Sequence, residues 1–301
     1  MLSYILTTMN YELIRILIAV IGTSIFSYFD IFKNRNVPDK LLYIFLGISF
    51  LFVIIDIQTL TSSLFWGVIM GVIGYLFYRA GQLGGADVIL FVSICLLLPS
   101  SPSLFTQNYS QMPFILSLLI MSGLFLLLFI ILKYLPKLLA KTLRGEIKLK
   151  TDKIMYSAGL VLMFLVVSYM LMEMGMGNPM PFVILLGYII LTTVFINIYK
   201  DELSAMMSKD IDLTKAGDRK KVEPEDVVAI ELMDKEYVKK HNIPKLLTKN
   251  ELDRLIKEKV KLKVLTDLPP FIPFVLLAML VLTLLGDPLY YIISNMFFPG
   301  F

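Results

Sequence analysis

Residues 114–135 read FILSLLIMSGLFLLLFIILKYL, and they contain a single charged side chain, Lys133, close to the end of the run. About 20 consecutive apolar residues are enough for a helix to cross the hydrocarbon core of a bilayer. Backbone amides and carbonyls find no partners in lipid, so such a run has to satisfy them within a helix. The stretch therefore predicts a membrane-spanning helix.

Comparable apolar runs occur along most of the chain. The 301 residues are 57% apolar and 17% charged, with a mean hydropathy of +0.77, whereas soluble domains are roughly 45–50% apolar and about 25% charged. We predict an all-α integral membrane protein with about eight transmembrane helices, at 12–29, 41–55, 64–79, 87–99, 114–135, 154–172, 181–198 and 269–286. Gly286-Asp287-Pro288 predicts a break after the last of them.

Lysine and arginine are concentrated in alternate connections, which are expected to lie in the cytoplasm. Nearly all of the 28 basic residues lie in or beside the connections 30–40, 80–86, 136–153 and 199–267, and none lies in 56–63, 100–113 or 173–180. We therefore expect a multi-pass protein of the plasma membrane with both termini outside. The net charge of +4 follows from this topology, so we expect a lipid bilayer as the partner and no nucleic acid.

The order of these segments predicts five parts. They are a membrane catalytic core (1–135), a basic cytoplasmic loop (136–153), spans six and seven (154–198), a cytoplasmic insert (199–267) and the last span with an outer C-terminus (268–301). In the insert, Thr248 and Glu251 form a capping-box pattern before an amphipathic helix that ends near Val264. Pro224 predicts the start of a helix over 224–240. We expect a small helical insert that either connects two spans or docks a partner from an assembly machine.

The chain has one cysteine, Cys95, and one histidine, His241. These counts exclude a disulfide framework and a zinc site built from histidine and cysteine. We expect no metal and no cofactor.

Acidic residues near membrane spans are candidates for function. Six such residues occur, at Glu12, Asp30, Asp39, Asp56, Asp87 and Glu173. The predicted topology puts Glu12, Asp56 and Glu173 at the outer ends of spans, where water would solvate them. The other three lie at the inner face.

Asp30 ends the first span, and Asp87 opens the fourth span after the small residues Gly84, Gly85 and Ala86. Two carboxylates in one site can share a proton, so that one acts as a base and the other as an acid on a water between them. The structural alternatives are a boundary residue at Asp30 and a helix cap at Asp87. From the helix dipoles we expect Asp87 to carry the charge and Asp30 to hold the proton more often.

Three further residues are secondary candidates. Asp39 follows Pro38 and either caps the second span or assists the pair. Arg79 and Gln82 precede the glycine-rich turn, and Arg79 either pairs with an acidic group or marks the membrane boundary.

Asp30 with the basic loop after it, Val37-Pro38-Asp39, and then Gly84-Gly85-Ala86-Asp87 resemble the type IV prepilin peptidases. The resemblance covers about residues 12–100 and is closest to the archaeal relatives that process preflagellins and pilin-like precursors. These are membrane aspartyl proteases of the Gly-x-Gly-Asp (GxGD) type. Ala86 replaces the second glycine of that motif, and the paired cysteines of the bacterial methylating members are missing, so methyl transfer is not expected.

The resemblance implies an aspartic endopeptidase that cuts precursor proteins with a short basic leader followed by a hydrophobic helix. The cut would lie at the cytoplasmic face. Three alternatives remain, namely a presenilin-type intramembrane protease, an ion-coupled transporter and a non-catalytic component of a pilus assembly system. The first lacks its Tyr-Asp pair here, because Phe29 separates Tyr28 from Asp30.

Overall fold

The computed structural model describes residues 2–33, 37–57, 59–81, 83–102, 113–147, 150–173, 178–215, 222 and 226–297, with the side chains of those between 11 and 294. Seven helices come first along the chain: α1 (Leu2–Phe32), α2 (Asp39–Ile55), α3 (Leu60–Arg79), α4 (Gly85–Leu97), α5 (Phe114–Leu143), α6 (Thr151–Glu173) and α7 (Met180–Met207). The strands β1 (Ser208–Asp212) and β2 (Lys261–Leu265) enclose the 3-10 helix η1 (Ile230–Leu232), α9 (Lys235–Lys240) and α10 (Lys249–Lys257). The helices α11 (Ile272–Leu285) and α12 (Pro288–Phe297) follow.

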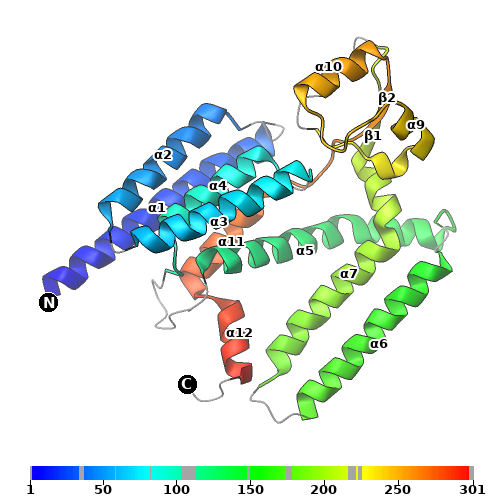
Figure 1. Cartoon of the computed structure of the whole chain (residues 1–301). Helices are drawn as coiled ribbons and strands as arrows, with labels where there is room; N and C mark the ends of the chain where they lie inside the picture. Colours follow the sequence, from blue (N-terminus) through cyan, green and yellow to red (C-terminus); the bar gives the residue numbers. More distant parts are fainter. Residues whose placement is uncertain are drawn as a thin grey trace.

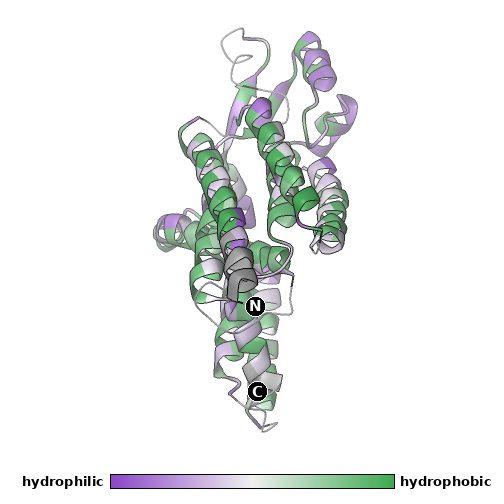
Figure 2. Cartoon of the chain, turned by 90° about the vertical axis from the view of Figure 1, so that its left-hand side faces the viewer, coloured by the Kyte–Doolittle hydropathy of each residue, from purple (hydrophilic) through white to green (hydrophobic). Residues whose placement is uncertain are grey.

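Every predicted span coincides with a helix, which confirms the all-α membrane class. Within the described residues, five helices are long and apolar enough to cross a membrane, namely α1, α3, α5, α6 and α7. The pair α11 and α12 would make a sixth span, bent by 56° at the predicted break. With 17 and 13 residues, α2 and α4 are shorter than these spans. Figure 2 shows hydrophobic residues along the long helices and hydrophilic residues gathered on the insert.

The predicted helix boundaries need correction on the insert side. Helix α5 continues through Pro136 to Leu143, so the first half of the predicted loop 136–153 is helical. Helix α7 continues to Met207 and leads directly into β1, so the insert begins at Ser208 and not at residue 199. Charged residues interrupt the hydrophobic pattern at these points without interrupting the helix, because lysine, glutamate and alanine are good helix formers.

One hydrophobic cluster joins α1, α2, α3, α4, α5 and α11. The buried side chains of α11 are Ile272, Val275, Ala278, Met279 and Leu282, and they pack with those of α1 and α5. Small residues allow close packing elsewhere: a Cβ atom at Gly74 would lie 2.8 Å from Cγ1 of Val88. Helix α11 is therefore part of the core, although more than a hundred residues of chain separate it from α5.

The insert has its own small core and is not purely helical. Strands β1 and β2 pair antiparallel, with Ser208 opposite Leu265 and Asp212 opposite Lys261. The helix predicted over 224–240 is wrong for its middle part, since Val227 and Val228 form isolated bridges with Leu246 and Val264. Residues 223–225, including Pro224, lie outside the described residues.

The helix predicted from Thr248 is confirmed, together with its capping box, but it ends at Lys257. Lys259 then adopts a positive φ of 55° and starts a turn into β2. The sequence Lys-Leu-Lys-Val-Leu at 261–265 alternates with a period of two. This period is typical of a strand and explains why the helix does not reach Val264.

The insert lies beside the ends of several membrane helices (Figure 1). It continues α7 directly, and its β2 leads through residues 266–271 into α11. A Cβ atom at Gly81, in the turn after α3, would lie 3.6 Å from Cβ of Leu246 and 3.9 Å from Cγ of Lys245. We call the end of the bundle that these contacts define the insert side.

Candidate active site

Asp30 is buried near the C-terminal end of α1. Asp30 is 7% exposed to solvent, and its Oδ2 atom accepts a hydrogen bond of 2.9 Å from the backbone N–H of Ile272. Ile272 is the first residue of α11, and the first amides of a helix have no partner within that helix. The carboxylate of Asp30 therefore lies at the end of one helix and at the beginning of another.

The contact with Ile272 bears on the expectation that Asp30, and not Asp87, more often holds the proton shared by the two aspartates. At the C-terminus of α1 alone, a negative charge on Asp30 would be disfavoured. The amide of Ile272 adds an interaction with a helix N-terminus, where a negative charge is favoured. Asp30 thus lies at the C-terminus of α1 and at the N-terminus of α11, so the dipole of α1 alone no longer decides which aspartate holds the proton.

Asp87 is the third residue of α4 and is half-buried. Its Oδ2 atom accepts a hydrogen bond of 3.1 Å from the backbone N–H of Gly84, just before the helix. A Cβ atom at position 84 would lie 3.2 Å from the same oxygen, which is tighter than an ordinary contact. Glycine at 84 thus leaves room for the carboxylate, and Gly85 and Ala86 form the first turn of α4. The capping interaction is compatible with both interpretations of Asp87.

The surroundings of the two aspartates are connected through α11. Helices α1 and α4 contact each other, and α1 ends where α4 begins, on the insert side (Figure 1). Phe91, one helical turn after Asp87, packs its ring against Phe271 at a centroid distance of 5.9 Å. Phe271 immediately precedes Ile272, whose amide contacts Asp30. The two carboxylates therefore belong to one region of the protein.

The secondary candidates lie around this region. Asp39 is the exposed first residue of α2, where the helix dipole favours a carboxylate. Arg79 is the exposed last residue of α3. The hydroxyl of Thr248, and to a smaller extent the charge of Arg79, hold the pKa of Glu251 below its ordinary value. Arg79 therefore lies close enough to the insert to act on its charges. Gln82 lies outside the described residues.

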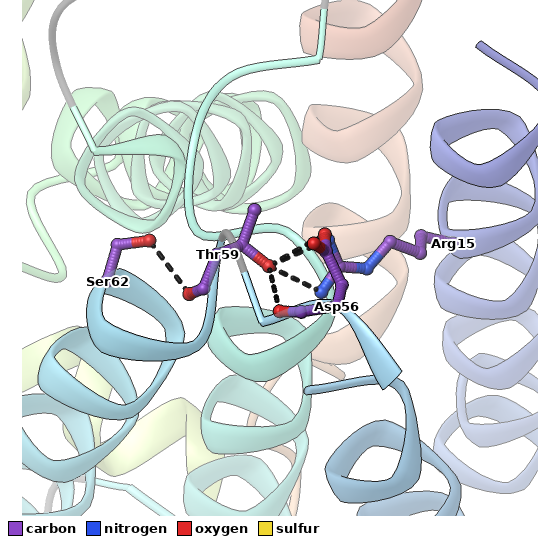
Figure 3. A network of polar contacts seen from close by, with 4 residues as sticks. All are labelled: Arg15, Asp56, Thr59 and Ser62. Carbon is purple, nitrogen blue, oxygen red and sulfur yellow. Dashed lines mark hydrogen bonds and ion pairs between the residues drawn. The ribbon is translucent and has the colours of Figure 1, made fainter. Parts of the chain in front are cut away.

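A second polar network starts at Arg15, about four helical turns before Asp30 on α1, and sequence reasoning missed it. Arg15 is 5% exposed, and its Nη1 atom forms an ion pair of 2.9 Å with Oδ2 of Asp56. Both terminal nitrogens of Arg15 also donate to the hydroxyl of Thr59 at 3.1 Å (Figure 3). Asp56, expected to be solvated at a span end, instead joins α1 to the turn between α2 and α3. The signal in the sequence was Arg15 itself, because it is the one basic residue that falls toward the predicted outer side and an acidic partner was to be expected there.

Comparison with known proteins gives one match. The sequence model of the type IV leader peptidase family matches residues 17–132. The matched segment runs from α1 into α5 and contains Asp30, Asp87 and the three small residues before Asp87. No curated protein and no solved structure matches the chain. The family resemblance seen in the sequence is thus confirmed, and the match does not extend to α11.

Proposed function

We propose that the chain is a membrane aspartic endopeptidase with Asp30 and Asp87 as its catalytic pair, on the basis of the match of residues 17–132 to the type IV leader peptidase family. The observation that carries the proposal is that the matched segment contains both aspartates. The burial of Asp30 and the shared surroundings of the two residues support it. Buried carboxylates are rare in membrane helices and usually serve a function.

The proposed reaction is general acid–base hydrolysis. One carboxylate takes a proton from a water molecule, and the water oxygen forms a bond to the carbon of the scissile peptide. The other carboxyl group, initially protonated, gives its proton to the carbonyl oxygen. The tetrahedral intermediate is then a geminal diol. When it collapses, the C–N bond breaks, the proton held by the pair passes to the leaving amine, and the pair takes a proton from one of the two diol hydroxyls, whose oxygen becomes the new carbonyl. The pair then has one proton again, as at the start.

The proposed substrates are precursors with a short basic leader before a hydrophobic helix. In the proposed topology the insert side faces the cytoplasm and both termini lie outside, because basic residues concentrate in the segments on that side. The hydrophobic helix of the precursor would lie in the bilayer, and its leader would remain in water. The bond between them would then lie at the depth of Asp30 and Asp87.

The decisive experiment is a cleavage assay in liposomes. A tagged pilin-type precursor is incubated with the unchanged protein, with Asp30→Asn and with Asp87→Asn. Asp152→Asn serves as the control, because it alters an exposed aspartate in the first turn of α6, outside the segment that matches the family. We expect cleavage by the unchanged protein and the control, and its loss in both pair variants. Cleavage that persists in either pair variant, in protein that remains folded, would remove that residue from the mechanism.

A non-catalytic role in an assembly machine remains the second candidate. It is favoured by the insert, which has a core of its own formed by buried residues such as Leu213, Leu247, Leu255 and Val264. A domain of this kind offers a surface for docking a partner. In that case Asp30→Asn and Asp87→Asn would leave assembly intact, whereas disruption of the insert would abolish it.

A further inference from the structure

The segment 266–272, which we call the strap, joins β2 of the insert to α11 on the insert side. Its first two residues are fixed to α7. The backbone N–H groups of Thr266 and Asp267 donate to the carbonyl oxygen of Met207, at 2.9 and 3.1 Å. The strap therefore leaves the insert at the point where α7 enters it.

The strap is next anchored on α5 through Asp267. The buried hydroxyl group of Tyr134 donates to the backbone oxygen of Asp267 at 3.3 Å. The Nζ atom of Lys133 lies 3.5 Å from Oδ2 of the same residue. Two successive prolines, Pro269 and Pro270, then restrict the backbone between this anchor and α11. A displacement at Asp267 would consequently be passed along the strap and not absorbed within it.

The far end of the strap reaches both halves of the proposed site. The ring of Phe271 packs on Phe91 of α4, and the amide of Ile272 donates to Asp30 of α1. All of these strap residues lie outside the segment 17–132 that matches the family. The acceptor, Asp30, lies inside it.

We propose that the strap is a positioning element for Asp30. The Ile272 amide fixes the orientation of the carboxylate, and the anchors at Asp267 set where that amide lies. Its effect on catalysis rests on the proposed peptidase function. Its contact with Asp30 does not, so the two can be tested separately.

The first test removes the amide hydrogen without changing the side chain. Residue 272 is replaced by the α-hydroxy analogue of isoleucine in the full-length protein, which converts the amide to an ester. The same exchange at Phe274 is the matched control, because its amide donates to the carbonyl of Phe271 at the start of α11. A hydrogen bond to a charged group is strong enough for its loss to slow cleavage about tenfold.

We expect the ester at 272 to lower the maximal single-turnover rate about tenfold, with little change in the precursor concentration that gives half of that rate. The control ester at 274 should cleave like the unchanged protein. A merely structural role would lower both variants together or raise the half-saturating concentration. Equal rates at 272 and 274 would overturn the proposal.

The second test addresses the anchor. Asp267→Ala removes the contact with Lys133, whereas Asp201→Ala removes a comparably exposed carboxylate that pairs with Lys150 and Lys153 between α6 and α7. Exposed ion pairs are weak, so we expect a decrease of about two- to fivefold in the maximal cleavage rate for Asp267→Ala alone. Equal effects of the two substitutions would count against an anchor at Asp267.

A third measurement needs no precursor. The first amides of a helix have no intrahelical acceptor, so the protection of the Ile272 amide against hydrogen exchange depends on Asp30. Asp30→Ala should accelerate its exchange, and Asp87→Ala should not. Failure of every form to cleave would reject the peptidase function and the catalytic role of the strap, while accelerated exchange would still establish the contact. Unchanged exchange in Asp30→Ala would overturn the contact and the proposal with it.

Discussion

The amide of Ile272 donates to the carboxylate of Asp30 across 2.9 Å, although 242 positions of sequence separate the two residues. The contact links two distant helices of the bundle, because it joins the end of α1 to the beginning of α11. It also shows that the segment that matches the family, residues 17–132, does not provide all the contacts of Asp30. The helix that supplies a donor to Asp30 lies beyond its end.

Replacing Gly84 by alanine should impair cleavage more than stability. The new Cβ atom would lie 3.2 Å from Oδ2 of Asp87, so the carboxylate has to shift by a few tenths of an ångström. A displacement of about 1 Å can lower a rate about a hundredfold, so a shift of this size should lower cleavage by about two- to tenfold. Precursor cleavage and thermal unfolding in detergent would be measured side by side.

The control for this substitution is Gly47→Ala, since nothing lies within 4 Å of a Cβ atom there. It should change neither cleavage nor unfolding appreciably. Full activity of Gly84→Ala would contradict a catalytic role for Asp87 in its observed position.

The helices were predictable because each follows from a local property, a long apolar run, that needs no knowledge of the fold. The capping box at Thr248 and the break at Gly286 are likewise local signals. Strand β2 was missed although its alternation is visible, because the capping box before it suggested one longer helix. The contacts of Asp30 and Arg15 were not accessible, since each partner lies at least 41 positions away.

A larger steric effect is expected at Gly74→Ala. The added Cβ atom would come within 2.8 Å of Val88, a stiff β-branched side chain in the first turns of α4. Overpacking of this kind typically costs about 1–3 kcal/mol. The melting temperature in detergent should therefore fall, and cleavage should fall with it because Val88 adjoins Asp87.

The matched variant is Gly123→Ala in α5, where the space around a Cβ atom is open within 4 Å. It should melt like the unchanged protein. If both variants melted together, the close approach of α3 and α4 at Gly74 would not be a determinant of stability.

The capping box of α10 predicts a dependence on pH. Hydrogen bonding from Thr248 is the main cause that lowers the pKa of Glu251, with a smaller effect from the nearby positive charges. A carboxyl group whose pKa is lower in the folded state stabilises that state above its ordinary pKa of 4.5. This contribution is lost as the pH falls below 4.5 and through the pKa of the folded state.

Thr248→Ala should therefore destabilise α10 by about 1 kcal/mol at neutral pH. The difference from the unchanged protein should shrink as the pH is lowered below 4.5, because the carboxylate is then protonated in both. Hydrogen exchange of the α10 amides at several pH values would measure this. Thr248→Ser keeps the hydroxyl group and should behave like threonine; a constant difference at all pH values would refute the explanation.

The ion pair between Arg15 and Asp56 should be a stability determinant that is separate from catalysis. Arg15 is almost completely buried, so Asp56→Ala leaves an arginine charge without its carboxylate in a poorly solvated place. Breaking a buried pair costs about 3–5 kcal/mol, and the partial exposure of Asp56 reduces this to about 2 kcal/mol. Replacing both residues, as in Arg15→Met with Asp56→Leu, should cost less than Asp56→Ala alone, because no unpaired charge remains.

Thermal unfolding of the three proteins, together with the cleavage rate of the folded fraction, would test this. The rate should stay unchanged, since Arg15 lies about four helical turns before Asp30 on α1. A cleavage defect in fully folded Asp56→Ala would instead mean that the surroundings of Arg15 and Asp30 are coupled along α1.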